Sequence, residues 1–244
     1  DAQESRGLGD VYKRQECTVW GFRQDAKDAP PEAWVIEHRV ISSDPTHDGA
    51  WSDLDSLLLE TWKTEDGRTL RIGAACIDSG GHHTSQAYAF CKERSGRHIH
   101  AIRGMGGARP VWIPKARKSK KYDAHFWIVG SDTAKDAIYA RLRKAGDGPG
   151  HIHLPASVDK AFLQQLTSEV VRTKYVKGKP VREWVLPPGK RNEVLDCAAY
   201  ALAALLARPV NWAQLERSQR PDAPAAKRWE SLLNLKSTRA EGLP

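Results

Sequence analysis

The spacing of apolar residues along the chain predicts strands and helices in alternation. Apolar and polar residues alternate over 16–22 and 33–41, and the turn that contains Pro30-Pro31 predicts that these two strands form a β-hairpin. Apolar residues recur at helical spacing over 51–62, where Ser52 can cap the first turn. Further strands are predicted at 70–78, 98–102 and 125–129, an extended piece at 151–154, and helices at 84–94, 131–144, 159–171 and 192–207.

This order of elements predicts an α/β fold in which a mixed sheet is flanked by helices. Residues 104–121 are rich in glycine, proline and lysine and are predicted to form a loop or flap outside the core. Residues 173–186 predict a basic β-hairpin that turns at Gly178. We expect three parts: an atypical segment at 1–15, one domain at 16–212, and a polar tail at 213–244.

Composition narrows the class of protein. The chain has 244 residues, of which 40% are hydrophobic, so it can bury a core, and its net charge of +8 suits nucleic acid or another anionic surface. The four cysteines form no C-x-x-C pair and are predicted to be free thiols in a reducing compartment. No apolar run is long enough to span a bilayer and no signal sequence opens the chain, so we expect neither a membrane partner nor secretion.

The segment around Asp78 is the first candidate for chemistry. An apolar run ends at Asp78, Gly80-Gly81 breaks the strand, and a helical pattern begins at Thr84. Polar groups converge at the carboxyl ends of strands in α/β proteins, and a carboxylate there is a common ligand of a divalent metal. An ordinary turn or capping aspartate explains the same pattern from the residues alone.

Glu193 and Asp196 are the second candidate. They stand three residues apart on the apolar helix at 192–207 and so share one face. A carboxylate on a buried helix is costly unless it is paired or binds a metal, although acids in a first turn also complement the helix dipole. Asp132, directly after a strand, is a third candidate metal ligand or else an N-cap, and Lys135 one turn later can reach a phosphate or only solvent.

Two basic segments, 92–121 and 172–191, indicate a polyanionic partner. Phosphate backbones are bound by Lys and Arg, and each segment contains a single acid among many cations. The candidate DNA-binding residues are Lys115, Arg117, Lys118, Lys120, Lys121, Lys174, Lys177, Lys179, Arg182, Lys190 and Arg191. Either segment on its own is also explained as an ordinary charged surface exposed to solvent.

Two further patterns bear on cofactors. His98-x-His100 and His151-x-His153 place imidazoles two residues apart, but no cysteine pair or HExxH motif supports them, so the sequence does not predict zinc. There is no Walker loop, so ATP hydrolysis by this chain is not expected.

Several phrases, in collinear order over 16–212, resemble the C-terminal nuclease domain of the large terminase subunit of lambda-type tailed phages. They are WVIEHRVISSDP (34–45), IDSGGHHTSQAYAFC (77–91), IVGSDTAKDAIYARL (128–142), GPGHIHLP (148–155), FLQQLTSEVV (162–171) and RNEVLDCAAYALAAL (191–205). The resemblance implies an RNase H-like fold and an endonuclease that uses two Mg²⁺ or Mn²⁺ ions to cut concatemeric phage DNA. It also implies an ATPase domain, absent here, a terminase small subunit and a portal as partners, and the host cytoplasm as location.

The resemblance also implies roles for single residues. Asp78 would be the metal ligand on the second strand, and Asp196, with or without Glu193, the ligand on the late helix. Asp1, in Asp1-Ala2-Gln3, matches the family's first-strand ligand, but it lies too far from the strand at 16–22. Residues 5–15 read as foreign or misjoined sequence, so we expect a lost first ligand and little nuclease activity.

Two alternatives from other classes remain. One is a non-catalytic DNA-binding or motor-docking module in which the acids serve as caps. The other is a different RNase H-like nuclease, of the transposase or resolvase type.

Overall fold

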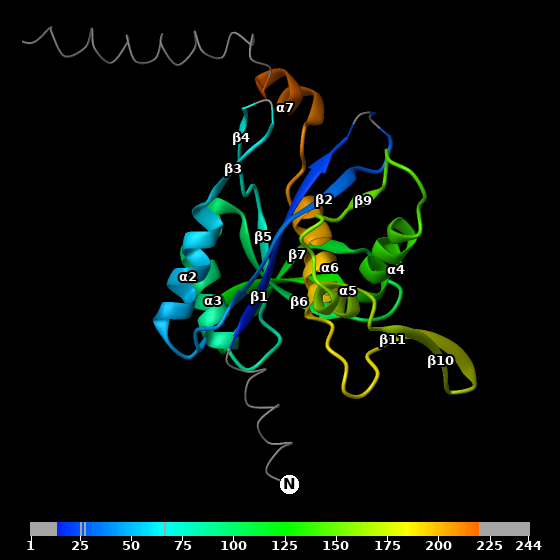
Figure 1. The fold of residues 1–244 in the computed structure, drawn as a ribbon. Coiled ribbons are helices and arrows are strands. Elements are labelled where there is room, and N and C mark those ends of the chain that lie inside the picture. Colours follow the sequence, from blue (N-terminus) through cyan, green and yellow to red (C-terminus); the bar gives the residue numbers. More distant parts are fainter. Residues whose placement is uncertain (1–13, 25, 27, 66, 220–244) are drawn as a thin grey trace, which may run out of the picture.

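The computed structural model describes residues 14–24, 26, 28–65 and 67–219 (Figure 1). β1 (Gln15–Arg23) and β2 (Glu32–Ile41) form the predicted antiparallel hairpin, with a bulge between Val19 and Trp20. The short strand β9 (Ile152–His153) adds in parallel to the other edge of β2. These three strands form one mixed sheet in the order β1-β2-β9.

A second mixed sheet has the order β5-β6-β8-β7. β5 (Ala75–Asp78), β6 (Ile99–Met105) and β8 (Ala124–Gly130) run parallel, and α3 (Thr84–Glu93) with the short helix η1 (Ser95–Arg97) makes the crossover that a parallel β5–β6 pair requires. The α/β class is therefore confirmed. The prediction of a single sheet is wrong for the described residues, because β1 and β5 are not paired with each other.

β7 (Trp112–Ser119) corrects the prediction of a loop or flap at 104–121. It pairs antiparallel with β8 at the edge of the second sheet, and its register shifts between Ile113 and Arg117, around Pro114. Edge strands tolerate proline and lysine, and a register shift accommodates a missing backbone donor. The composition that suggested a loop is thus that of an edge strand.

The helix α6 (Glu193–Ala207) joins the two sheets, and it contacts both β1 and β5. The second sheet is covered on both faces, as the alternation along β6 shows. Ile99 and Ala101 pack in the cluster that contains Tyr88 of α3, whereas Ile102 packs with Ala203 of α6. On its other flank α6 packs against α4 (Ser131–Leu142) and α5 (Lys160–Leu166).

The remaining elements lie around this core (Figure 1). The predicted basic hairpin is present as β10 (Val170–Val176) and β11 (Lys179–Val185), turns at Lys177 and Gly178, and projects from the body. The other elements are α2 (Asp48–Leu59), β3 (Thr61–Lys63), β4 (Thr69–Arg71) and α7 (Trp212–Gln219).

Three predicted boundaries were wrong. The helix predicted at 51–62 ends at Leu59, the strand predicted at 70–78 is two strands, and the helix predicted at 159–171 ends at Leu166. The four cysteines are free thiols, as predicted, and burial raises the pKa of Cys17 and of Cys91 to about 12. Within the described residues no helix is both long and apolar enough to cross a membrane.

Candidate active site

Asp78 is the last residue of β5, and its side chain is exposed. Its Oδ1 accepts the Gly80 backbone N–H at 2.8 Å, and its Oδ2 accepts the hydroxyl of Tyr200 at 3.2 Å. A Cβ at position 80 would lie 3.1 Å from Oδ1, so this close turn suits glycine. Behind it, the hydroxyl of the buried Ser79 donates to the Ile102 carbonyl at 2.8 Å. The carboxylate is held in place and stays open to solvent.

Asp196 lies in the first turn of α6 beside a buried lysine. The Nζ of Lys135, on α4, lies 2.8 Å from Asp196 Oδ1 and 2.5 Å from Glu169 Oε1. The side-chain amide of Asn192 donates to the same two acids, at 3.0 Å to Asp196 Oδ2 and at 2.5 Å to Glu169 Oε1. We call Asp78, Glu169, Asp196 and Lys135 the acid cluster.

The acid cluster has three carboxylates and one ammonium. Burial raises the pKa of Asp196, and Lys135 offsets this only in part because Glu169 and Asp78 add negative charge. Burial works against the charged form of Lys135, but the charges of Asp196 and Glu169 outweigh it, so the pKa of Lys135 lies above its usual value. Burial and the charges of Asp78 and Asp196 raise the pKa of Tyr200 well above its usual value, so its hydroxyl stays protonated. The site therefore has unbalanced negative charge that a cation would neutralise.

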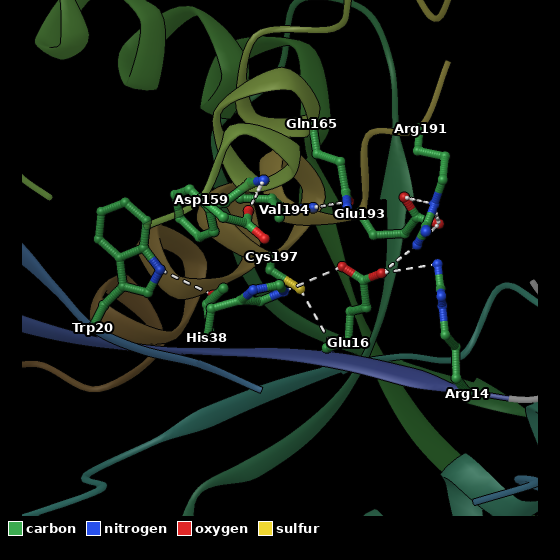
Figure 2. A network of polar contacts seen from close by, with 12 residues as sticks. Arg14, Glu16, Trp20, His38, Asp159, Gln165, Arg191, Glu193, Val194 and Cys197 are labelled. Atoms are coloured by element: carbon green, nitrogen blue, oxygen red, sulfur yellow. Dashed lines mark hydrogen bonds and ion pairs between the residues drawn. The ribbon is translucent and has the colours of Figure 1, made fainter. Parts of the chain in front are cut away.

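Glu193 takes part in a different network, on the side of α6 that faces β1 (Figure 2). Arg191 Nε donates to Glu193 Oε1 at 3.0 Å, and the same guanidinium pairs with Glu16. Glu16 is nearly buried, with 4% of its side chain exposed, and also contacts Arg14 at 3.3 Å and His38 at 3.3 Å. We call Glu16, Glu193, Arg14, Arg191 and His38 the arginine cluster. Two acids there face two arginines, so the charges balance.

The other two predicted ligands are not brought to Asp78 by any described contact. Asp132 lies in the first turn of α4, and its Oδ2 accepts the backbone N–H of Gly107 at 2.8 Å. It makes no capping bond, since the N-cap is Gly130 without a side-chain partner, so the N-cap reading was wrong. Asp132 instead holds the loop after β6. Asp1 lies outside the described residues.

The predicted DNA-binding residues fall into two surfaces and one exception. Lys115, Arg117, Lys118, Lys120 and Lys121 are exposed on β7 and in the turn after it. Lys174, Lys177, Lys179 and Arg182 are exposed on the β10–β11 hairpin, and Lys190 is exposed in the loop before α6. Arg191 is the exception, because it is only partly exposed and its guanidinium binds the two acids of the arginine cluster. Arg182 is exposed but pairs with Asp136.

Sequence reasoning missed Glu169 and Glu16. Glu169 precedes a strand whose residues are all exposed, and its only local signal, an acid next to a valine pair, is common. Glu16 starts an alternating strand at a position that favours a polar residue. Both side chains are buried by partners distant in sequence, so these two carboxylates could not be found from local pattern.

Comparison with known proteins identifies the class. The chain belongs to the family described as terminase large subunit gpA, endonuclease domain, which matches residues 1–217.

Two curated relatives are similar to it. The large terminase subunit of Escherichia phage lambda is 31% identical over 223 residues, which cover 87% of this chain and 33% of that protein. The large terminase subunit of Enterobacteria phage P21 is 28% identical over 218 residues, which cover 84% of this chain and 32% of that protein. The chain thus spans about one third of the length of these relatives. No solved structure matches it.

Proposed function

We propose that the chain is a divalent-metal-dependent, RNase H-like endodeoxyribonuclease domain that cuts concatemeric viral DNA during genome packaging. The observation that carries the proposal is the acid cluster, in which a carboxylate at a strand end and one on α6 share an excess of negative charge. The family supports the reaction class. The terminase small subunit, the portal and the host cytoplasm follow as partners and location from this assignment.

The residues present fit a divalent metal ion. Asp78 and Asp196 offer carboxylate oxygens, the donors that Mg²⁺ and Mn²⁺ prefer, and Mg²⁺ is commonly held by one or two carboxylates together with substrate phosphates. Asp78 is exposed, so a phosphate can approach it from solvent. The ion would supply activation of water and stabilisation of the leaving oxygen.

The chain's own residues prepare this site. Tyr200 and Gly80 each donate to one oxygen of Asp78 and so fix its orientation. Lys135 pairs with both Glu169 and Asp196. Of these two acids Asp196 is the more exposed, with 33% of its side chain exposed against 4% for Glu169. Asn192 orients both acids through one amide group. We therefore propose that Asp196 binds a cation jointly with Asp78, whose charge acts on it.

The β10–β11 hairpin is proposed to bind the DNA backbone. Its base is fixed to α4, because Arg182 donates to both oxygens of Asp136 at 2.6 Å and Trp184 packs on Tyr139 with ring centroids 4.6 Å apart. Lys177 and Lys179 stay exposed near its turn. An arm that is fixed at its base and carries cations near its tip suits phosphate contacts, which position DNA without reading its sequence.

A two-ion mechanism requires a further carboxylate. In the described part of the chain, Asp78 and Asp196 belong to no group of three His, Cys, Asp or Glu side chains whose ligand atoms all lie within 4.8 Å of one another. We therefore propose that this chain binds one ion at the pair and cuts DNA weakly.

The test is Mn²⁺ binding, measured by titration calorimetry, with plasmid nicking as the second readout. We expect one Mn²⁺ site that is lost in Asp78→Asn and in Asp196→Asn and kept in Glu193→Gln, the matched control from the same helix. Nicking should be weak, should require Mn²⁺, and should disappear in Asp78→Ala. A parent chain without an Mn²⁺ site, or one that keeps its site in Asp196→Asn, would refute the assignment.

One observation favours the non-catalytic alternative. The contact of Lys135 with both Glu169 and Asp196 is also how a purely structural ion pair is built. In that case the domain would bind DNA through the hairpin and retain full affinity without any divalent metal. No observation favours the transposase or resolvase alternative.

A further inference from the structure

A second group of potential metal ligands lies where a glycine-rich turn leads into β9. Asp147, His151 and His153 each offer a ligand atom, and these atoms all lie within 4.8 Å of one another. Among the described residues this is the one group of three or more such side chains. It shares no residue with the acid cluster.

Backbone geometry brings the three side chains together. The parallel pairing of β9 with β2 sets Trp34 opposite His153, and residues two apart in extended chain share a face, so His151 and His153 lie together with ring centroids 4.6 Å apart. The preceding turn has positive φ at Gly146, Gly148 and Gly150, which lets the chain fold Asp147 back toward the histidines.

A buried carboxylate fixes the His153 ring. Glu32 is 3% exposed, and its Oε1 lies 2.6 Å from His153 Nε2 and 3.0 Å from the backbone N–H of Gly148. Because an ionised carboxylate only accepts, we assign the proton to Nε2, which leaves Nδ1 with a lone pair. The ring also stacks on Trp34 at 4.7 Å and an interplanar angle of 4°. A carboxylate that orients a ligating histidine in this way is the usual second partner at zinc sites.

His151 supplies an independent observation. Its Nδ1 is buried and has no hydrogen-bond partner in the described part of the chain. A buried polar atom without a partner costs about 1–3 kcal/mol, so such atoms in folded proteins generally have a water or an ion as partner. An ion bound between the two rings and Asp147 would satisfy this nitrogen.

We propose that Asp147, His151 and His153 bind a divalent transition metal of the zinc type. Two imidazoles and one carboxylate make a donor set suited to Zn²⁺, with water in the fourth position. The all-oxygen acid cluster instead suits Mg²⁺ or Mn²⁺. The ion joins the 146–150 turn to β9 and, through His153 and Glu32, to β2. Its role is to hold this turn against the first sheet, and it stands independently of the nuclease assignment.

The probe is zinc itself, added in slight excess to chelator-treated protein in a buffer with millimolar Mg²⁺. After removal of free metal, elemental analysis should give about one Zn²⁺ per chain for the parent. Asp147→Asn and His151→Ala should each lower the Zn²⁺ affinity at least tenfold, and Glu32→Gln should lower it roughly tenfold to a hundredfold while all three ligands remain. The spectrum of a Co²⁺-loaded sample reports directly on the nitrogen and oxygen donors.

Two controls make the result decisive. His47→Ala removes an exposed histidine elsewhere, and the double variant Asp78→Asn, Asp196→Asn removes the acid cluster; both should keep the zinc. Asp147 is exposed, so Asp147→Asn should fold even if a histidine variant does not. Unchanged zinc content and affinity in Asp147→Asn and His151→Ala, or zinc lost only in the double variant, would overturn the proposal.

Discussion

The carboxylates on two sides of the helix α6 differ in how far cationic partners balance their charge. On the side facing β1, Glu193 and the buried Glu16 each meet Arg191, and Arg14 completes the balance (Figure 2). On the side facing α4, the ammonium of Lys135 pairs with Glu169 and Asp196, and the charge of Asp78 acts on Asp196 as well. Glu193 and Asp196 are only three positions apart on the same helix, so the difference comes from their neighbours.

This difference suggests a structural role for the acids of the arginine cluster and a metal-binding role for those of the acid cluster. A buried acid with an arginine partner is satisfied, and removing its charge costs stability. An acid whose pKa burial has raised, next to further carboxylates, gains from a bound cation. The comparison predicts that variants of the arginine cluster change stability, whereas variants of the acid cluster change the response to metal.

The largest effect on stability should come from Glu16→Gln. The substitution leaves Arg191 and Arg14 facing a neutral, nearly buried group, and breaking a buried pair in this way costs about 3–5 kcal/mol. Urea unfolding should show this loss, with Mn²⁺ affinity unchanged. Glu193→Gln is the matched control, and because 30% of the Glu193 side chain is exposed, its loss should be about 1 kcal/mol or less. An equal loss of unfolding free energy in both variants would contradict the view that the burial of Glu16 makes its ion pairs the more important ones.

Local sequence pattern singled out two acids of the acid cluster, but it did not indicate Glu16 of the arginine cluster. Asp78 became a candidate because a strand ends and a glycine turn begins there, and Asp196 because a carboxylate interrupts an apolar helix; their role as ligands stays a prediction. Both signals lie within a few residues. The α/β class, the first hairpin and the basic hairpin were predicted on the same kind of local evidence and are confirmed.

The rest depends on contacts between distant segments. Glu169 meets Lys135 across 34 positions, and Glu16 meets Arg191 across 175, so neither pair has a local signal. The expectation that Glu193 and Asp196 act together assumed that residues on one helical face share partners, but α4 lies on one flank of that face and β1 on the other. The division into two sheets also depends on pairing, which apolar alternation does not specify.

A smaller effect should follow from Lys135→Met. Without the ammonium, Glu169 and Asp196 face each other with only Asn192 as donor. Because the pKa of Asp196 is already raised, this acid can take up a proton rather than remain an unpaired charge, so the loss is that of a charged hydrogen bond, about 1.5–3 kcal/mol. Because the ammonium no longer competes for Asp196, added Mn²⁺ should raise the free energy of unfolding more in this variant than in the parent. Lys92→Met, at an exposed lysine, is the control and should change neither quantity. A variant that Mn²⁺ stabilises no more than the parent would contradict the view that Lys135 occupies a cation position.

The smallest effect should come from Tyr200→Phe, which tests how much the orientation of Asp78 matters. The hydroxyl donates to Asp78 Oδ2 at 3.2 Å, while Gly80 continues to hold Oδ1, so half of the carboxylate's support remains. Loss of one such bond is worth about 1 kcal/mol, which corresponds to roughly fivefold weaker Mn²⁺ binding by calorimetry. Tyr88→Phe is the matched control, because the buried Tyr88 hydroxyl has no partner in the described part of the chain, and its loss should leave Mn²⁺ affinity unchanged. If Tyr200→Phe binds Mn²⁺ as tightly as the parent, the hydroxyl of Tyr200 is not needed to orient Asp78. The Mn²⁺ affinity of the acid cluster would then depend on its charges rather than on this hydrogen bond.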